Sequence, residues 1–167
     1  MYFLRSILCL GYLAVATGCV GYQMGNQALF RPDVKTVHVP VFESDSFRQF
    51  LGERLTEAVV KEVESRTPFK VAPVSVADSM LQGKILTERK RILIESRTDE
   101  GRDIQTNMIV QVGWNDRYGR PLMKSREIQI NQFANFVPEG GQSLSTAQQE
   151  VIDKIARDIV SQMEIPW

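Results

Sequence analysis

The segment from residue 104 to residue 114 constrains the fold most strictly, because its side chains alternate in character. One side of the alternation comprises Ile104, Thr106, Met108, Val110, Val112 and Trp114. The other side comprises Gln105, Asn107 and Gln111, with Ile109 as the exception. Successive side chains point to opposite faces of a strand, whereas a helix would scatter this pattern around its axis. The segment therefore predicts a β-strand with one face on a core and one polar face.

Turn-forming residues flank this strand on both sides. The segment Thr98–Arg102 contains Gly101, and the segment Asn115–Pro121 contains Asn, Asp, Gly and Pro, which are typical of hairpin turns. Residues 81–95 and 122–136, outside these turns, have the composition of strands. Two successive hairpins predict three antiparallel strands in meander order.

The first strand of this meander changes its alternation. Leu81 and Ile85 have odd numbers, whereas Ile92 and Ile94 have even numbers. One extra residue in a strand produces such a shift, so the pattern predicts a β-bulge near Glu88–Arg91. In the last strand of the meander, we expect Ile128 and Ile130 to face the core.

Two amphipathic helices are predicted, one before the meander and one after it. Ser46 and Gln49 fit a capping box for the first helix, which ends before Pro68. Its apolar stripe comprises Phe47, Phe50, Leu51, Leu55, Ala58, Val59 and Val63. Ser143 or Ser145 caps the second helix, whose stripe comprises Leu144, Ala147, Val151, Ile152, Ile155, Ala156, Ile159 and Met163. We expect Phe47 and Phe50 to lie in the core.

A short strand is predicted on either side of the first helix, at residues 35–42 and 69–74. Pro40 removes a backbone donor, so the first of these strands lies at an edge or ends there. A strand–helix–strand unit is compatible with a right-handed crossover, which pairs its strands in parallel. The predicted fold class is therefore α+β, with two layers in which two helices pack on one face of a small mixed sheet of four to five strands.

The N-terminal segment predicts export from the cytoplasm. Arg5 precedes an uncharged, mostly apolar run from Ser6 to Val15, and Ala16-Thr17-Gly18-Cys19 follows. This order is typical of a bacterial signal peptide, and the run is too short to span ~30 Å of hydrocarbon. A Cys after three small residues resembles the lipobox of bacterial lipoproteins, although Ala16 stands where Leu is usual. The alternative is an ordinary secretory signal that contains a cysteine.

These patterns divide the chain into three parts. Residues 1–18 are predicted to be a lipoprotein signal peptide, residues 19–34 a linker lipidated at Cys19, and residues 35–167 a single domain. Removal of the signal leaves about 150 residues, a common size for one compact domain.

The composition argues against several classes of function. The 20 basic and 20 acidic side chains balance, which argues against a nucleic-acid partner. Cys9 would leave with the signal and Cys19 would carry lipid, so the domain has no thiol for a metal or a nucleophile. His38 is the single histidine, and we expect a satisfied or solvated side chain on a strand. We predict no enzyme, no catalytic residues and no cofactor.

A metal site is not expected either. Asp99, Glu100 and Asp103 stand close together in the sequence, but their spacing is not that of an EF-hand. The chain also contains no P-loop, GxGxxG, GxSxG, HExxH or CxxC motif.

One local cluster of cations could bind a ligand. Arg89, Lys90 and Arg91 are consecutive, and alternation along a strand sends Arg89 and Arg91 to one face and Lys90 to the other. Such side chains grip phosphate or carboxylate through charge-assisted hydrogen bonds. Alternatively, they guard a strand edge against aggregation.

An ordered series of short motifs resembles LptE, the family of lipopolysaccharide-assembly lipoproteins. The series comprises Cys19 with Gly21-Tyr22, KTVHVPVFES at 35–44, LTEA at 55–58, KEVESRT at 61–67, Ala77-Asp78 and Leu81-x-Gly83. The likeness covers the anchor and the first half of the mature chain. From Thr98 onward it rests on the order of the elements.

The resemblance implies a two-layer domain, in agreement with the periodicity. It also implies a lipid-anchored protein on the periplasmic side of the outer membrane, which plugs the β-barrel LptD, helps it to assemble and contacts lipopolysaccharide in transit. Arg89, Lys90 and Arg91 would then meet phosphorylated lipid. Val20 is not the Asp that holds lipoproteins at the inner membrane, so delivery to the outer membrane is expected.

A barrel plug would need a polar, uncharged face toward the hydrophilic barrel interior. The residues predicted for this face are Gln105, Asn107, Gln111, Asn115, Gln129, Asn131 and Gln132. Two other classes stay open at this point. One is a periplasmic lipoprotein that binds another envelope protein or a glycan, and the other is a hydrolase built on His38 or a pair of carboxylates.

Overall fold

The computed structural model describes residues 29–46, 48, 50–95 and 101–165, with the side chains of residues 95, 101 and 102 left aside. The predicted signal, Cys19 and the turn residues 96–100 lie outside this part of the chain, as do Phe47, predicted for the core, and Gln49, predicted for the capping box. The elements in chain order are β1 (Thr36–His38), β2 (Glu43–Ser44), α2 (Leu51–Arg66), β3 (Lys70–Val71), β4 (Ser79–Glu95), β5 (Gly101–Asp116), β6 (Ile128–Phe136), the 3₁₀ turn η2 (Pro138–Gly140) and α3 (Leu144–Gln162).

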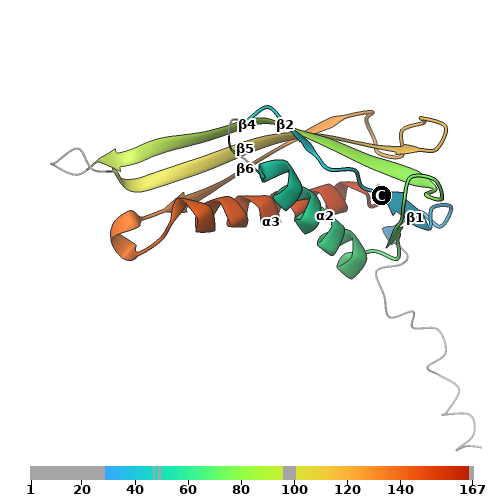
Figure 1. Ribbon diagram of the computed structural model, residues 1–167, viewed down its shortest axis with the longest axis horizontal. Coiled ribbons are helices and arrows are strands. Elements are labelled where there is room, and N and C mark those ends of the chain that lie inside the picture. Colours follow the sequence, from blue (N-terminus) through green and yellow to red (C-terminus); the bar gives the residue numbers. More distant parts are fainter. Residues whose placement is uncertain (1–28, 47, 49, 96–100, 166–167) are drawn as a thin grey trace, which may run out of the picture.

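The strands form one mixed sheet of six strands, and both helices lie on one of its faces (Figure 1). The order is β3-β1-β4-β5-β6, with β2 paired to β4. β1 pairs in parallel with β3 and with β4, as the crossover predicts. β4, β5 and β6 pair antiparallel in the predicted meander order. The two-layer α+β fold is confirmed, and the two-residue strand β2 extends the sheet beyond the predicted number of strands.

The alternation of β5 decides which face of the sheet the helices cover. Met108, Val110, Val112 and Trp114 are each at most 1 % exposed beneath α2 and α3. The face that carries these residues is called here the helix-covered face, and the opposite face the open face. Phe30 and Val34, which precede β1, are buried in the same core. The ring of Phe69 packs against those of Phe30 and Trp114, with centroid distances of 5.6 and 5.5 Å.

The register of β4 corrects the predicted position of the bulge. Ile85 pairs with Val110, but Thr87 pairs with Ile109, so the extra residue is Leu86 rather than a member of Glu88–Arg91. Pairing is regular from Thr87 to Ile92, and further irregularities follow near Ile94. The apolar pattern conceals the bulge because residues 87–91 are polar on both faces. β6 is also shorter than predicted, since it begins at Ile128 rather than Leu122.

The start of α2 differs from the prediction. The helix begins at Leu51, and its N-cap is Phe50, whose φ of 63° places it in the left-handed region without a side-chain cap. The Ser46 hydroxyl accepts a hydrogen bond from the amide of Arg48, which closes a local turn before the helix. Phe50 is 66 % exposed, so its predicted place in the core is wrong. The chain bends at Phe50, and the buried stripe starts with the next residue.

The second helix follows the prediction closely. Ser143 is the N-cap of α3, and its hydroxyl accepts a hydrogen bond from the amide of Thr146 at 3.2 Å. The predicted stripe is buried from Ala147 to Met163. α3 packs against α2 and β6, and Arg54 of α2 donates to the Gln149 side chain of α3 at 2.8 Å.

Phe42, directly before β2, packs closely against Gly52 of α2 and Gly83 of β4. A Cβ atom on Gly52 would lie 2.1 Å from the carbonyl oxygen of Phe42, and one on Gly83 would lie 2.4 Å from its ring. The amide of Phe42 donates to the Thr56 hydroxyl at 2.9 Å, and this hydroxyl donates to the carbonyl oxygen of Gly52 at 2.8 Å. The absence of a side chain at Gly52 and at Gly83 therefore allows this close approach of Phe42.

Replacement of Gly52 by Ala should lower the stability of the fold. Ala is favoured over Gly in a helix by about 1 kcal/mol, but the clash with the Phe42 backbone forces the helix away from the sheet. We expect a net loss of about 1–3 kcal/mol in the free energy of unfolding, measured by urea denaturation. Gly140→Ala is the matched control, because its Cβ would meet Val137 at an ordinary 3.9 Å. A Gly52→Ala protein as stable as the wild type would contradict this packing.

Candidate functional site

The predicted cations lie in the second half of β4 and divide between the two faces of the sheet. Arg89, Lys90 and Arg91 pair in register with Asn107, Thr106 and Gln105 of β5. Directly opposed residues share a face. Thr106 is 1 % exposed on the helix-covered face, so Lys90 belongs to that face, and Arg89 and Arg91 belong to the open face. The alternation predicted from the sequence is confirmed.

All three cations are exposed, and among the described residues none of them forms an ion pair with a carboxylate. Other arginines differ in this respect. Arg48, Arg117 and Arg120 each bind an Asp or Glu at 2.7–3.1 Å. The charge of Arg89, Lys90 and Arg91 is therefore available to an anionic ligand.

Apolar side chains follow these cations directly. Ile92, Leu93 and Ile94 are 45, 42 and 56 % exposed, which is unusual for three consecutive large apolar residues. The register irregularities near Ile94 accompany this exposure. Arg89–Ile94, called here the basic–apolar segment, thus presents positive charge and exposed hydrocarbon side by side. Surfaces of this kind mark sites that bind a partner or an amphiphile.

Glu88 holds the segment on the helices. Its side chain is 4 % exposed on the helix-covered face and binds Arg48 Nε at 2.7 Å. It also accepts hydrogen bonds from Gln148 Nε2 of α3 at 2.9 Å and from the Thr106 hydroxyl at 3.4 Å. This carboxylate therefore ties β4 to β5, to α3 and to the chain before α2. Sequence reasoning missed it, although its even number places it inward once the bulge is located.

The open face carries a band of amide side chains beside the cations. Gln105 Nε2 donates to Asn135 Oδ1 at 3.2 Å, and Asn107 Nδ2 donates to Asn131 Oδ1 at 2.5 Å. Gln111 also donates to Glu127 on this face. Gln132 was predicted here, but it pairs with Met108 and donates to Asp158 of α3, so it belongs to the helix-covered face. Residue parity within β6 decides this, because Gln129 and Asn131 are odd-numbered.

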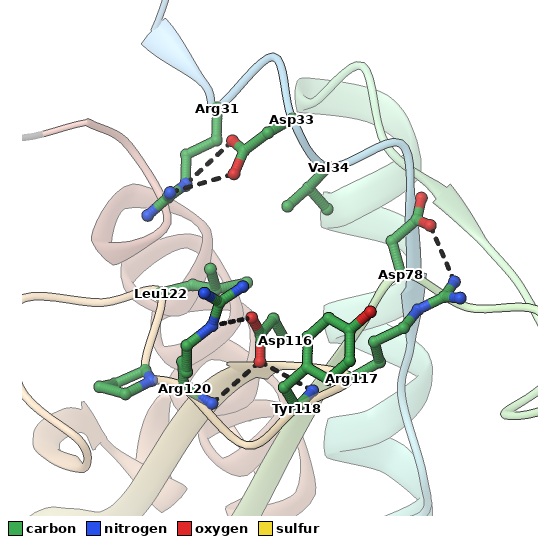
Figure 2. A pocket seen from close by; sticks show the side chains of 10 residues that line it. Arg31, Asp33, Val34, Asp78, Asp116, Arg117, Tyr118, Arg120 and Leu122 are labelled. Atoms are coloured by element: carbon green, nitrogen blue, oxygen red, sulfur yellow. Dashed lines mark hydrogen bonds and ion pairs between the residues drawn. The ribbon is translucent and has the colours of Figure 1, made fainter.

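A cleft of about 610 Å³ lies at the other end of the β4–β5 hairpin (Figure 2). The turn between β5 and β6, the start of β4 and the segment before β1 form its walls. Its lining residues are Arg31, Asp33, Val34, Asp78, Asp116, Arg117, Tyr118, Arg120, Pro121 and Leu122. The turn was predicted from the sequence, but the approach of Arg31 and Asp33 to it is a result of the tertiary fold.

Ion pairs neutralise the charges in this cleft. Arg31 binds Asp33 at 3.1 Å, Arg117 binds Asp78 at 3.1 Å and Arg120 binds Asp116 at 2.7 Å. The Thr36 hydroxyl, followed by the amides of Lys35 and Thr36, lowers the pKa of Asp78. Burial raises the pKa of Asp116, but hydrogen bonds from the Arg120 amide and side chain and the Tyr118 amide bring that pKa below its usual value. The carboxylates stay ionised and brace the turn.

The surroundings of His38 indicate a structural role rather than a catalytic one. Its Nδ1 lies 3.0 Å from the carbonyl oxygen of Ala72 on a half-buried strand, as expected for a satisfied histidine. Within the described residues, no group of three or more His, Cys, Asp or Glu side chains could hold a metal ion. Asp99 and Glu100 lie outside these residues. In the same part of the chain, no helix is both long and apolar enough to cross a membrane.

Solved structures with the same fold come from bacteria. Lipoprotein B of Nitrosomonas europaea has a TM-score of 0.50 and 16 % identity over 84 % of this chain and 90 % of that chain. A minor lipoprotein of Acinetobacter baumannii has a TM-score of 0.50 and 17 % identity over 78 % and 92 %. A protein of Xanthomonas campestris has a TM-score of 0.58 and 12 % identity over 82 % and 87 %. Comparison with curated proteins finds no match.

The fold is thus a two-layer α+β domain that is similar to those of bacterial lipoproteins. The profile of the LptE family, described as lipopolysaccharide-assembly, matches residues 34–164. The match covers nearly the whole of the described chain. The chain belongs to the LptE family, as the resemblance of its motifs implies.

Removal of the Glu88 carboxylate should destabilise the fold. In Glu88→Ala, the Thr106 hydroxyl and the Gln148 amide lose their acceptor in a buried place. We expect a loss of about 2–4 kcal/mol in the free energy of unfolding, measured by urea denaturation. Glu57→Ala on the exposed side of α2 is the control, with an expected change within about 0.5 kcal/mol. Equal losses of unfolding free energy in the two variants would show that the Glu88 hydrogen bonds do not stabilise the fold.

Proposed function

We propose that this protein is a non-enzymatic lipoprotein of the outer membrane that plugs the lipopolysaccharide-exporting barrel LptD, helps it to assemble and contacts lipopolysaccharide in transit. Membership of the LptE family supports the general role in lipopolysaccharide assembly. The observation that carries the contact with lipopolysaccharide is the basic–apolar segment. Its cations have no carboxylate partner among the described residues, and its apolar side chains are exposed.

The chemistry of the segment suits an amphiphile that carries phosphate. Lipopolysaccharide has phosphate groups close to its acyl chains. Arg89, Lys90 and Arg91 can form charge-assisted hydrogen bonds to these phosphates. Ile92, Leu93 and Ile94 can cover part of the hydrocarbon next to them. Charged residues that only protect the edge of the sheet against aggregation would not need the three exposed apolar residues beside them.

The open face supports the role as a plug. Gln105, Asn107, Gln111, Gln129 and Asn131 present amide groups on a sheet that the helices leave uncovered. Amides donate and accept hydrogen bonds without a charge to desolvate, so they suit a hydrophilic barrel interior. The proposed partner is therefore an LptD-like β-barrel.

The anchor belongs to the same proposal. Lipid on Cys19 would attach the protein to the periplasmic side of the outer membrane. Leu29, the first described residue, stands ten positions after Cys19, and an extended chain over that distance reaches at most about 33–36 Å. The cleft of Figure 2 includes Arg31 and Asp33, so it lies at the anchored end of the domain. The basic–apolar segment lies at the other end of the hairpin.

Reversal of charge in the basic–apolar segment should weaken the binding of lipopolysaccharide. We expect Arg89→Glu/Lys90→Glu/Arg91→Glu to raise the Kd for purified lipopolysaccharide at least about tenfold, measured by calorimetry in detergent. Lys61→Glu/Lys124→Glu/Arg126→Glu changes the net charge equally at other exposed positions and should change the Kd less than about threefold. Circular dichroism checks that both variants fold. Equal weakening of lipopolysaccharide binding by the two variants would favour the alternative, in which Arg89–Arg91 protect the strand edge against aggregation.

The anchor and the barrel can be tested together in cells. Wild-type protein should incorporate labelled fatty acid, fractionate with the outer membrane and copurify with an LptD-like barrel. Cys19→Ala removes the acylated thiol, so the label should be lost and the protein should leave the membrane fraction. Ser6→Ala, within the predicted signal, is a control that should change neither result. Copurification of a different envelope protein, with the barrel absent, would favour a binding module and contradict the plug.

A further inference from the structure

Three neighbouring strands place nine residues in a regular array on the open face. The register forms three rows, each with one residue of β4, β5 and β6 in that order. The rows are Thr87, Ile109 and Asn131; Arg89, Asn107 and Phe133; and Arg91, Gln105 and Asn135. Strands lie about 4.8 Å apart, so each row spans about 10 Å. This open-face array is the set of residues considered below.

The two arginines form one border of the open-face array and an aromatic ring forms part of the other. Arg89 and Arg91 are exposed on β4, and no described carboxylate pairs with them. Phe133 is 53 % exposed on β6, where a large apolar side chain on a solvent-facing edge has no role in the core. The helices lie on the opposite face of the sheet (Figure 1), in agreement with the exposure of this ring.

Amide side chains of β5 lie between these borders and form hydrogen bonds with amide side chains of β6. Gln105 donates to Asn135, and Asn107 donates to Asn131 and to the carbonyl oxygen of Gln132. Each of these bonds uses one end of an amide. Within the described structure, Gln105 Oε1, Asn107 Oδ1, Asn131 Nδ2 and Asn135 Nδ2 therefore keep donors and acceptors for a ligand.

The array matches the chemistry of a phosphorylated sugar. A sugar ring has an apolar face that packs on an aromatic ring, and hydroxyl groups at its rim that exchange hydrogen bonds with amides. Guanidinium groups bind phosphate in a bidentate manner. We propose that the open-face array binds a phosphorylated oligosaccharide, and that Lys90, on the other face, is not part of this site. The proposal rests on the proposed function and assigns the sugar part of lipopolysaccharide to this array. Gln111 and Gln129, which pair on the same face outside the array, remain for the contact with the barrel interior.

The other ligand classes fit the array less well. An acyl chain needs a continuous apolar surface, whereas this face has amides between Phe133 and the arginines. A nucleic acid needs a more extended basic surface than two arginines on a chain with 20 basic and 20 acidic side chains.

The test uses the full-length lipidated protein in detergent and three probes. The first is the phosphorylated oligosaccharide obtained from lipopolysaccharide by complete removal of its acyl chains. The second is the same oligosaccharide without its phosphates, and the third is complete lipopolysaccharide. Calorimetry gives the Kd of each. The variants are Phe133→Ala and Arg89→Gln/Arg91→Gln. The matched controls are Phe50→Ala, another exposed aromatic, and Lys124→Gln/Arg126→Gln, two exposed cations before β6.

The expected results separate the array from exposed cations and aromatic rings elsewhere on the protein. The acyl-free oligosaccharide should bind the wild type, and dephosphorylation should weaken it about tenfold. Arg89→Gln/Arg91→Gln should weaken the phosphorylated probe about tenfold and the dephosphorylated probe little. Phe133→Ala should weaken both probes at least about threefold. Phe50→Ala and Lys124→Gln/Arg126→Gln should leave the Kd of both probes within about twofold.

Two results would overturn the assignment and would leave the proposed function standing. Either the complete lipopolysaccharide binds while its acyl-free oligosaccharide does not, or the oligosaccharide binds equally well to Phe133→Ala and Arg89→Gln/Arg91→Gln. Failure of complete lipopolysaccharide to bind the wild-type protein would instead overturn the proposed contact with lipopolysaccharide, and the assignment with it.

Discussion

Burial of the apolar side of β5 beneath α2 and α3 is the constraint on which the rest of the structure depends. Met108, Val110, Val112 and Trp114 form the floor of the core, and the helices supply Leu55, Val59, Ile155 and Ile159 from the other layer. Because both helices cover the same face, the opposite face keeps its polar side chains in solvent. The long pairing of β4 with β5 then carries Arg89–Ile94 to the end of the sheet farthest from the ion-paired cleft.

The two ends of the β4–β5 hairpin differ in whether their cations form ion pairs. In the cleft, each of Arg31, Arg117 and Arg120 has an Asp partner within 3.1 Å, so the charges brace a turn. In the basic–apolar segment the cations have no carboxylate partner among the described residues, and hydrocarbon is exposed next to them. An arginine in an ion pair uses its hydrogen-bond donors on the carboxylate, whereas an arginine without such a partner keeps these donors for another molecule. The ligand-binding proposals depend on this difference, and membership of the LptE family supports them.

Much of the fold could be predicted from the sequence, and the site only in part. The alternation of 104–114, the stripe of α3 and the division of Arg89 and Arg91 from Lys90 are set by local periodicity, and the structure confirms them. The bulge at Leu86 was misplaced because the polar residues after it give no apolar signal on either face. Phe50 matches the helical spacing, but its left-handed backbone makes the helix and its buried stripe begin one residue later, at Leu51. Glu88 was missed because a buried carboxylate has no sequence pattern without its partners.

The sequence by itself determined which side of each element is apolar, since a period of two or 3.6 residues depends only on neighbouring positions. It also determined the position of the cations and of the turn between β5 and β6, and it left Ser143 and Ser145 as candidates for the N-cap, which the structure assigns to Ser143. Only the tertiary structure decided what lies opposite each side chain. Gln148 meets Glu88 across 60 residues of chain, and Asn107 and Phe133 join Arg89 in one row. Such contacts depend on strand register and helix placement, which the packing of the whole domain selects.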